Sequence, residues 1–123
     1  MANSKNSIQI IGINASGINA LSSYLQNLVI EAEIIACPSR ILKSIPEWWR
    51  ERNIISPLPK LISSDNTTKL IKELKSQNNK VVILASGDPL WFGIGRLLLE
   101  QFPKEKLSFH PSPTSFQLAF SRL

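Results

Sequence analysis

The feature that most constrains the fold is a fully apolar run, Val81–Leu84, that is followed closely by a loop of small residues. The run reads VVIL, without the alternation of apolar and polar side chains that marks a strand with one solvated face. Such runs are typical of a central parallel strand that is covered by helices on both sides. We therefore predict a strand at Lys80–Ala85 in the middle of a parallel sheet.

The rest of the chain alternates between short β-branched runs and segments with helical periodicity. Further strands are expected at Ile8–Ile13, Glu33–Ala36, Asn53–Ser56 and Leu107–His110. Helices are expected at Ala20–Ala32, Arg40–Ser44, Ser64–Gln77 and Gly93–Gln101, and from Ser115 to the end. Ser22 or Asn19 could cap the first helix, and Pro46 closes the second. The alternation predicts an α/β fold, an open, mostly parallel five-stranded sheet with helices on both faces.

The composition fits one domain in a reducing compartment. The chain has 123 residues with 43% hydrophobic content, and no apolar run approaches the roughly 20 residues that span a bilayer. Its start lacks the pattern of a signal peptide. Cys37 is the only cysteine and His110 the only histidine, which excludes an internal disulfide and a zinc quartet. We expect a cytoplasmic protein with no membrane anchor and no structural metal.

The net charge of +5 comes from lysines and arginines that are scattered along the chain, with a local cluster only at Arg50 and Arg52. This pattern is typical of a solvated surface and gives little reason to expect nucleic-acid binding. A positive field would also attract an acidic small molecule. Composition alone leaves both readings open.

Ligands of open parallel sheets gather at the carboxyl ends of the strands. Four loops occupy that position in the predicted fold, namely Asn14–Gly17, Cys37–Arg40, Ser86–Trp91 and Ser112–Ser115.

The first of these loops has two of the three glycines of the dinucleotide fingerprint, Gly12 and Gly17. Asn14 replaces the middle glycine and would intrude where backbone must approach a pyrophosphate. No acidic residue follows the second strand to hold a ribose, and no P-loop pattern occurs. The pattern therefore argues against a nicotinamide or flavin site, and the spacing alone favours a plain tight turn over another ligand site.

The loop after the central strand reads SGDPLWFGIG from Ser86 to Gly95. Gly87 leaves room for a ligand to touch backbone, and the carboxylate of Asp88 can accept hydrogen bonds. Asp88 before Pro89 is equally typical of a helix N-cap with proline at the first helical position.

The stretch Ser86–Gly95 resembles the GDP loop of the tetrapyrrole (corrin/porphyrin) methylases, and in particular the LASGDPLFYGIG of the branch that acts on precorrin-6Y. Two further stretches agree in order: the first strand with its glycine loop, and residues 111–120, PSPTSFQLAF, similar to the family's PGxSSxQLAxAR. The resemblance covers residues 1–123 but only the N-terminal half of the family. It implies an N-terminal domain whose C-terminal partner domain is absent from this chain.

The resemblance implies S-adenosylmethionine as the cofactor, bound between two α/β domains. The residues that it places at the cofactor lie in the loops after the first, fourth and fifth strands: Ala15, Ser86, Gly87, Asp88, Trp91, Thr114 and Ser115. The first loop departs from the family's GIGPGG, because Asn14, Ala15 and Ser16 replace glycine, proline and glycine. Some relatives have a carboxylate after the second strand as a proton acceptor, but Cys37–Ser39 offers none, and we assign no catalytic base.

The activity implied by the resemblance is methylation of C5 of a precorrin or cobalt-precorrin ring in cobalamin biosynthesis. The implied partners are a corrinoid substrate, a second copy of the chain, and a fused or separate enzyme that methylates C15 and decarboxylates. Methyl transfer from a sulfonium depends mainly on alignment, which can lower a barrier by about 7 to 11 kcal/mol. Two alternatives stay open: a methylase of similar fold with another substrate, such as diphthine or ribosomal RNA, and a non-catalytic binding or scaffold domain.

Other side chains have two readings each. Cys37 is a small buried filler or a nucleophile, and His110 lies at a sheet edge or faces the cleft. The pair Trp48 and Trp49 is a platform for a macrocycle or an anchor of a domain or subunit contact. Four basic residues are solvated or hold substrate carboxylates: Arg40, Lys43, Arg50 and Arg52.

Overall fold

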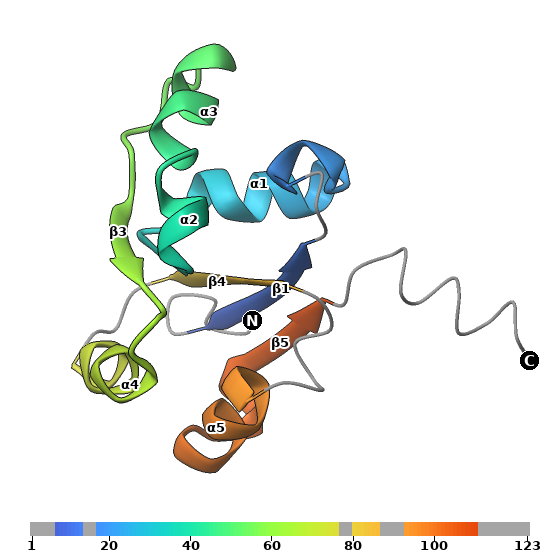
Figure 1. The fold of residues 1–123 in the computed structure, drawn as a ribbon. Helices are drawn as coiled ribbons and strands as arrows, with labels where there is room; N and C mark the ends of the chain where they lie inside the picture. Colours follow the sequence, from blue (N-terminus) through green and yellow to red (C-terminus); the bar gives the residue numbers. More distant parts are fainter. Residues whose placement is uncertain (1–6, 14–16, 77–79, 87–92, 111–123) are drawn as a thin grey trace, which may run out of the picture.

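Five strands form one parallel sheet between two layers of helices (Figure 1). The computed structural model describes residues 7–13, 17–76, 80–86 and 93–110. Within them the strands are β1 (Ile8–Ile13), β2 (Ile34–Cys37), β3 (Lys60–Ser63), β4 (Val81–Ser86) and β5 (Leu107–His110). Their order is β3-β2-β4-β1-β5, and every pairing is parallel. The predicted fold class is confirmed.

The apolar run of β4 occupies the centre of the sheet, as its sequence predicts. Val81 pairs with Ile8 of β1 on one side and with Ile34 of β2 on the other. Residues 81–84 are all buried, and they alternate between two cores. Val82 and Leu84 belong to one hydrophobic cluster, and Val81 and Ile83 to the other.

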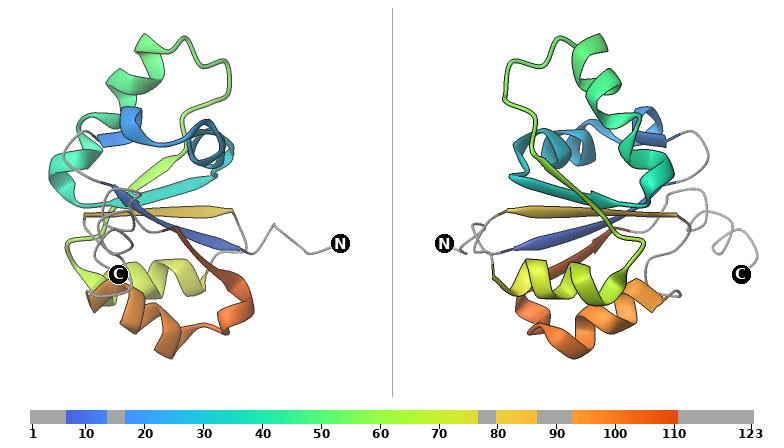
Figure 2. Two further views of the ribbon diagram at one scale, coloured as in Figure 1. Left: turned by 90° about the vertical axis from the view of Figure 1, so that its right-hand side faces the viewer. Right: turned by 60° about the vertical axis from the view of Figure 1, so that its left-hand side comes forward.

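Two helical layers cover the two faces of the sheet (Figure 2). The layer over Val82 and Leu84 holds a 3-10 turn, η2 (Gly17–Ala20), and the helices α1 (Ser23–Glu31), α2 (Ser39–Leu42) and α3 (Ile45–Glu51). The layer over Val81 and Ile83 holds α4 (Thr67–Lys75) and α5 (Gly93–Gln101), after which comes η3 (Lys104–Lys106). In the described part of the chain, no helix is long and apolar enough to cross a membrane.

Polar side chains mark where the longer helices begin. The hydroxyl of Ser22 accepts a hydrogen bond from the backbone N–H of Leu25, so Ser22, and not Asn19, caps α1. The side chain of Asn66 accepts from the N–H of Lys69 in the same way. Helix α4 therefore begins at Thr67, three residues later than predicted.

The predicted strand at Asn53–Ser56 is wrong, because this segment completes the end of α3. Asn53 has φ 54°, a left-handed conformation that no strand residue adopts. The N–H of Ile54 then bonds to the carbonyl of Trp49. Strand β3 instead begins at Lys60, directly after Pro59, so the prolines precede the strand and interrupt no hydrogen-bond ladder.

Pro46 also acts differently from the prediction, since it lies in the first turn of α3 and ends no helix. The first turn has no intrahelical partner for its N–H groups, so proline loses nothing there. The short helix expected at Arg40–Ser44 is present as α2, and α3 follows it almost at once. The expected helix from Ser115 lies outside the described residues.

Candidate functional site

Strands β1 and β4 are neighbours whose following segments leave the sheet in opposite directions. The chain after β1 passes through η2 to α1 on one face, and the chain after β4 passes to α5 on the other face. Ile13 and Ser86, the last residues of the two strands, are paired in register. Diverging connections of this kind open a crevice at the carboxyl ends of two adjacent parallel strands, which is where open α/β sheets bind ligands.

The resemblance places seven residues at the cofactor. Of these, Ser86 lies within the described residues, where it is the last residue of β4. The other six lie outside the described residues: Ala15, Gly87, Asp88, Trp91, Thr114 and Ser115. Their loops begin directly after Ile13, Ser86 and His110. Since β1, β4 and β5 run parallel, all three loops start at the same end of the sheet, where the carboxyl ends of the strands lie.

The turn η2 lies on the connection between β1 and α1, and a side chain of α1 contacts it. Gly17 adopts φ 73°, and no described atom beyond its two chain neighbours lies within 4 Å of the position that a Cβ would take there. The N–H of Leu21 bonds to the carbonyl of Ile18 at 3.0 Å. The Nε2 group of Gln26 lies within hydrogen-bond distance of the carbonyls of Ile18, Asn19 and Leu21, at 3.3, 3.4 and 3.0 Å. One amide group thus lies close to two carbonyls of η2 and to one carbonyl just after it.

Helix α3 reaches the same turn through Trp48. Its Nε1–H donates to Oδ1 of Asn19 at 2.9 Å, and Nη2 of Arg52 donates to the same oxygen at 3.0 Å. The guanidinium of Arg52 lies over the Trp48 ring, 5.3 Å from its centroid, in a cation–π contact. Arg52 is therefore engaged within the fold.

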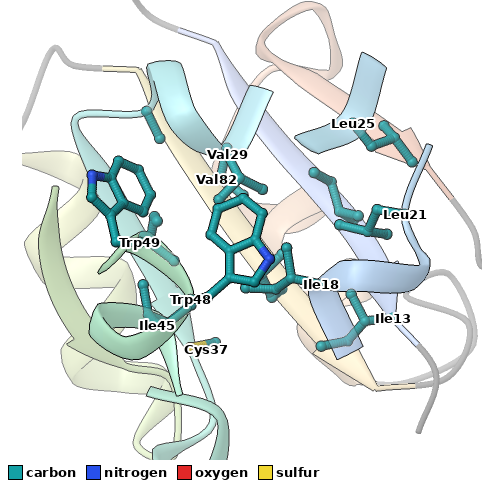
Figure 3. Packing of buried hydrophobic residues seen from close by; sticks show 14 residues of the cluster. Ile13, Ile18, Leu21, Leu25, Val29, Cys37, Ile45, Trp48, Trp49 and Val82 are labelled. Atoms are coloured by element: carbon teal, nitrogen blue, oxygen red, sulfur yellow. The ribbon is translucent and has the colours of Figure 1, made fainter. Parts of the chain in front are cut away.

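Neither predicted role of the tryptophan pair is found. The side chains of Trp48 and Trp49 are buried in the core over Val82, with 6% and 7% exposure, and pack edge to face (Figure 3). Trp49 donates its Nε1–H to the carbonyl of Ser56 at 2.7 Å, away from the turn. Both rings are core residues of this domain, and a platform or an exposed contact would require them at the surface.

A pocket of about 230 Å³ lies between η2 and α3. Its lining residues come from these two elements and from the segment just before α3: Gly17, Ile18, Asn19, Ser44, Glu47, Trp48 and Glu51. Two of them carry carboxylates, so the pocket is unsuited to an acidic substrate.

A carboxylate does stand at the end of β2, but it comes from the next strand. Asp65 follows β3, and its oxygens accept hydrogen bonds from the hydroxyl of Ser39 at 2.6 Å and from the N–H of Ser39 at 3.3 Å. The hydroxyl of Ser63 lies 3.1 Å from that of Ser39 and accepts from the N–H of Asp65. Sequence spacing gives no signal for this contact, because parallel strand pairing brings the two loops together.

The bonds from Ser39 hold the pKa of Asp65 below its ordinary value of 3.8. A carboxylate that is ionised so readily, and that already accepts two donors, is a weak proton acceptor. Asp65 therefore fixes the loop after β2, and the assignment of no catalytic base stands as a prediction.

Cys37 is the last residue of β2 and is fully buried. Burial, with a smaller effect from the negative charge of Asp65, raises the pKa of the thiol to about 12. The thiolate is the nucleophilic form, so this cysteine is inert at neutral pH. The reading of Cys37 as a small buried filler agrees with its place in the core.

His110 ends β5, an edge strand, and its ring is half-buried. Its Nε2 lies 2.7 Å from Oε1 of Gln9, and the ring of Tyr24 meets it edge to face at 6.3 Å. Burial lowers the pKa of His110 from its ordinary value of 6.5. Of the two readings from the sequence, the position at a sheet edge is the one observed.

The fold is an open α/β domain in which the connections change direction between β1 and β4, the position at which such sheets generally bind ligands. The chain belongs to the tetrapyrrole (corrin/porphyrin) methylase family, whose model matches residues 8–123. A precorrin-6Y C(5,15)-methyltransferase (decarboxylating) of Sinorhizobium sp. is 29% identical over 118 residues, which are 94% of this chain and 27% of that protein. The chain thus spans about a quarter of the length of this curated relative.

Proposed function

We propose that the protein is an S-adenosylmethionine-dependent methyltransferase that acts on C5 of a precorrin or cobalt-precorrin ring in cobalamin biosynthesis. Membership of the family supports the class of reaction, and the name of the relative supports the substrate class. The observation that carries the proposal is the pairing of Ile13 with Ser86 at the crevice, because two loops of the family resemblance start from these residues.

The described residues fit such a cofactor. The connections after β1 and β4 diverge, and the space beside Gly17 is open, so backbone can approach a ligand there. The residues proposed to hold it are those of the resemblance: Ala15, Ser86, Gly87, Asp88, Trp91, Thr114 and Ser115. The cofactor would supply an electrophilic methyl group on a sulfonium.

The contribution of the chain itself is positioning. Paired strand ends fix the origin of each loop, and alignment of the acceptor carbon with the methyl group supplies much of the rate gain. Arg40 and Lys43, on or just after α2, are exposed near the carboxyl end of β2. We propose that their charges attract the carboxylates of a corrinoid.

We further propose that residues 1–123 act as the N-terminal domain and that a second domain completes the cofactor site. A homodimer, and a fused or separate enzyme that methylates C15 and decarboxylates, are the partners proposed with it. The relative's activity belongs to a protein of which this chain matches 27%.

Because a second domain is proposed to complete the cofactor site, the test is a calorimetric titration of S-adenosylhomocysteine into the protein that carries both domains and into two variants of it. One-site binding is expected for the wild type, with roughly 10- to 150-fold weaker binding by Asp88→Ala, since a hydrogen bond to a charged group contributes about 1.5 to 3 kcal/mol. Glu105→Ala, an exposed carboxylate on η3 before the amino end of β5, is the matched control and should bind as the wild type does. A folded protein that does not bind would refute the cofactor assignment.

The substrate is tested separately. Incubation with precorrin-6Y and ¹³C-methyl-labelled cofactor should place the label on C5, as read by NMR of the product. Label at another carbon would retain the methyltransferase and refute the C5 assignment.

A further inference from the structure

The turn η2 is restrained from two sides. From α1, the side chain of Gln26 lies within hydrogen-bond distance of two carbonyls of η2 and of the carbonyl of Leu21 just after it. From the other side, Trp48 of α3 and Arg52 at its C-cap converge on the side chain of Asn19. The second restraint is long-range, because 29 residues separate Asn19 from Trp48.

The donor types fix how this contact is made. The indole Nε1–H and the guanidinium can only donate, so the Asn19 amide must present its oxygen to both. The Trp48 side chain is 6% exposed, and an indole N–H at such a site favours a protein partner. Arg52 lies over the same ring and closes a three-residue contact.

The sequence at the start of η2 does little to fix the conformation of the turn, so contacts from elsewhere have to restrain it. Gly17 enters it in a left-handed conformation, and glycine leaves the backbone more freedom than any other residue. The three residues before Gly17, Asn14 to Ser16, include no proline that would restrict φ. A fixed conformation therefore has to come from contacts with the helices.

We propose that Asn19, held by Trp48 and Arg52, is a positioning residue that keeps η2 in the conformation in which it borders the methyl-donor site. The inference rests on the proposed function, because η2 matters to the cofactor only if the crevice binds it. It assigns α3 a part in the site although none of the proposed cofactor residues lies on that helix.

Two tryptophan variants form a matched pair for the test. Trp48→Phe and Trp49→Phe each remove one indole N–H from α3 and keep an aromatic ring in the core. The lost bond of Trp48 ends on η2, whereas that of Trp49 ends on Ser56. A general loss of stability affects both variants, and a loss of positioning affects the first alone.

The first readout needs no ligand. Amide hydrogen exchange at Leu21, whose N–H closes the turn on Ile18, should be about five- to tenfold faster in Trp48→Phe, as expected for the loss of one hydrogen bond. Trp49→Phe should leave it unchanged. Equal acceleration in the two variants, or none in either, overturns the inference.

The second readout is the dissociation constant of S-adenosylhomocysteine for the protein that carries both domains. It should rise about five- to tenfold in Trp48→Phe and Asn19→Ala and stay within about twofold in Trp49→Phe. Asn19→Asp keeps an acceptor for both donors and should restore binding. If Asn19→Asp binds as poorly as Asn19→Ala, the contact does not act through its acceptor oxygen and the inference is wrong. If the folded wild type does not bind at all, the proposed function fails, while exchange at Leu21 still decides whether Asn19 positions the turn.

Discussion

The carboxylate of Asp65 accepts both the hydroxyl and the backbone N–H of Ser39, a residue 26 positions earlier in the chain. Ser39 begins α2, and the residue at its N-cap position is Pro38, which makes no side-chain hydrogen bond. The missing cap is thus supplied by the loop after β3. This contact joins the carboxyl ends of β2 and β3 directly.

Removing this carboxylate should destabilise the fold in a pH-dependent way. The pKa of Asp65 is lowered in the folded state, so its contribution is present above pH 3.8 and is lost as the pH falls through the folded value. Asp65→Ala should therefore be less stable than the wild type at pH 7, and the difference should shrink below pH 3.8. Urea unfolding across this range measures it, with Glu105→Ala as the exposed control. A constant difference at every pH would contradict the role of the charge.

The thiol of Cys37 should resist modification until the protein unfolds. With a pKa of about 12, about one thiol in ten thousand is ionised at pH 8, compared with about a quarter of free cysteines. Labelling with a disulfide reagent at pH 8 should be at least about a hundredfold slower for the native protein than in denaturant. Rapid native labelling would show that the strand end is open to solvent.

Mild acid should weaken the fold through His110. Burial lowers its pKa, so its contribution is present above pH 6.5 and is lost as the pH falls through the folded value. The melting temperature of the wild type should drop between pH 7.5 and pH 5, and that of His110→Gln should drop less. Because His110 is the only histidine, an identical drop in both would assign the effect to other groups.

Two aliphatic truncations distinguish the observed sheet from the one expected at Asn53–Ser56. Leu84 is 0% exposed in β4, so Leu84→Ala should cost about 2 to 5 kcal/mol of unfolding free energy. Ile55 is 99% exposed, and Ile55→Ala should change that free energy by less than about 0.5 kcal/mol. Urea denaturation of both variants makes the comparison. A large cost at Ile55 would indicate that this side chain is buried against another surface.

Local patterns predicted the parts of the fold that local physics determines. The apolar run of β4 and the starts of α1 and α4 depend on residues that are close together in the sequence, and both were predicted to within a few positions. The third strand was misplaced because Asn53–Ser56 has strand-like composition. In the structure, the carbonyl of Trp49 accepts the N–H of Ile54, and its indole N–H donates to the carbonyl of Ser56, so the segment packs against the end of α3.

The same division holds at the candidate site. The position of the candidate site follows from the strand order and from the loops that the sequence predicts at the carboxyl ends of the strands, such as the one after Ser86. The contacts of Asn19 with Trp48 and of Ser39 with Asp65 join residues far apart in sequence, and neither has a spacing that a single sequence could reveal.

The place of β4 between β1 and β2 has a consequence for how the chain folds. During synthesis β1 and β2 are both made before β4, which joins them, so until residue 86 is made β1 has no partner and β2 can pair only with β3. Nucleation must wait for contacts between distant segments, which slows folding and leaves apolar strand edges open to aggregation. Synthesis past β5 is then the point at which the whole sheet can assemble.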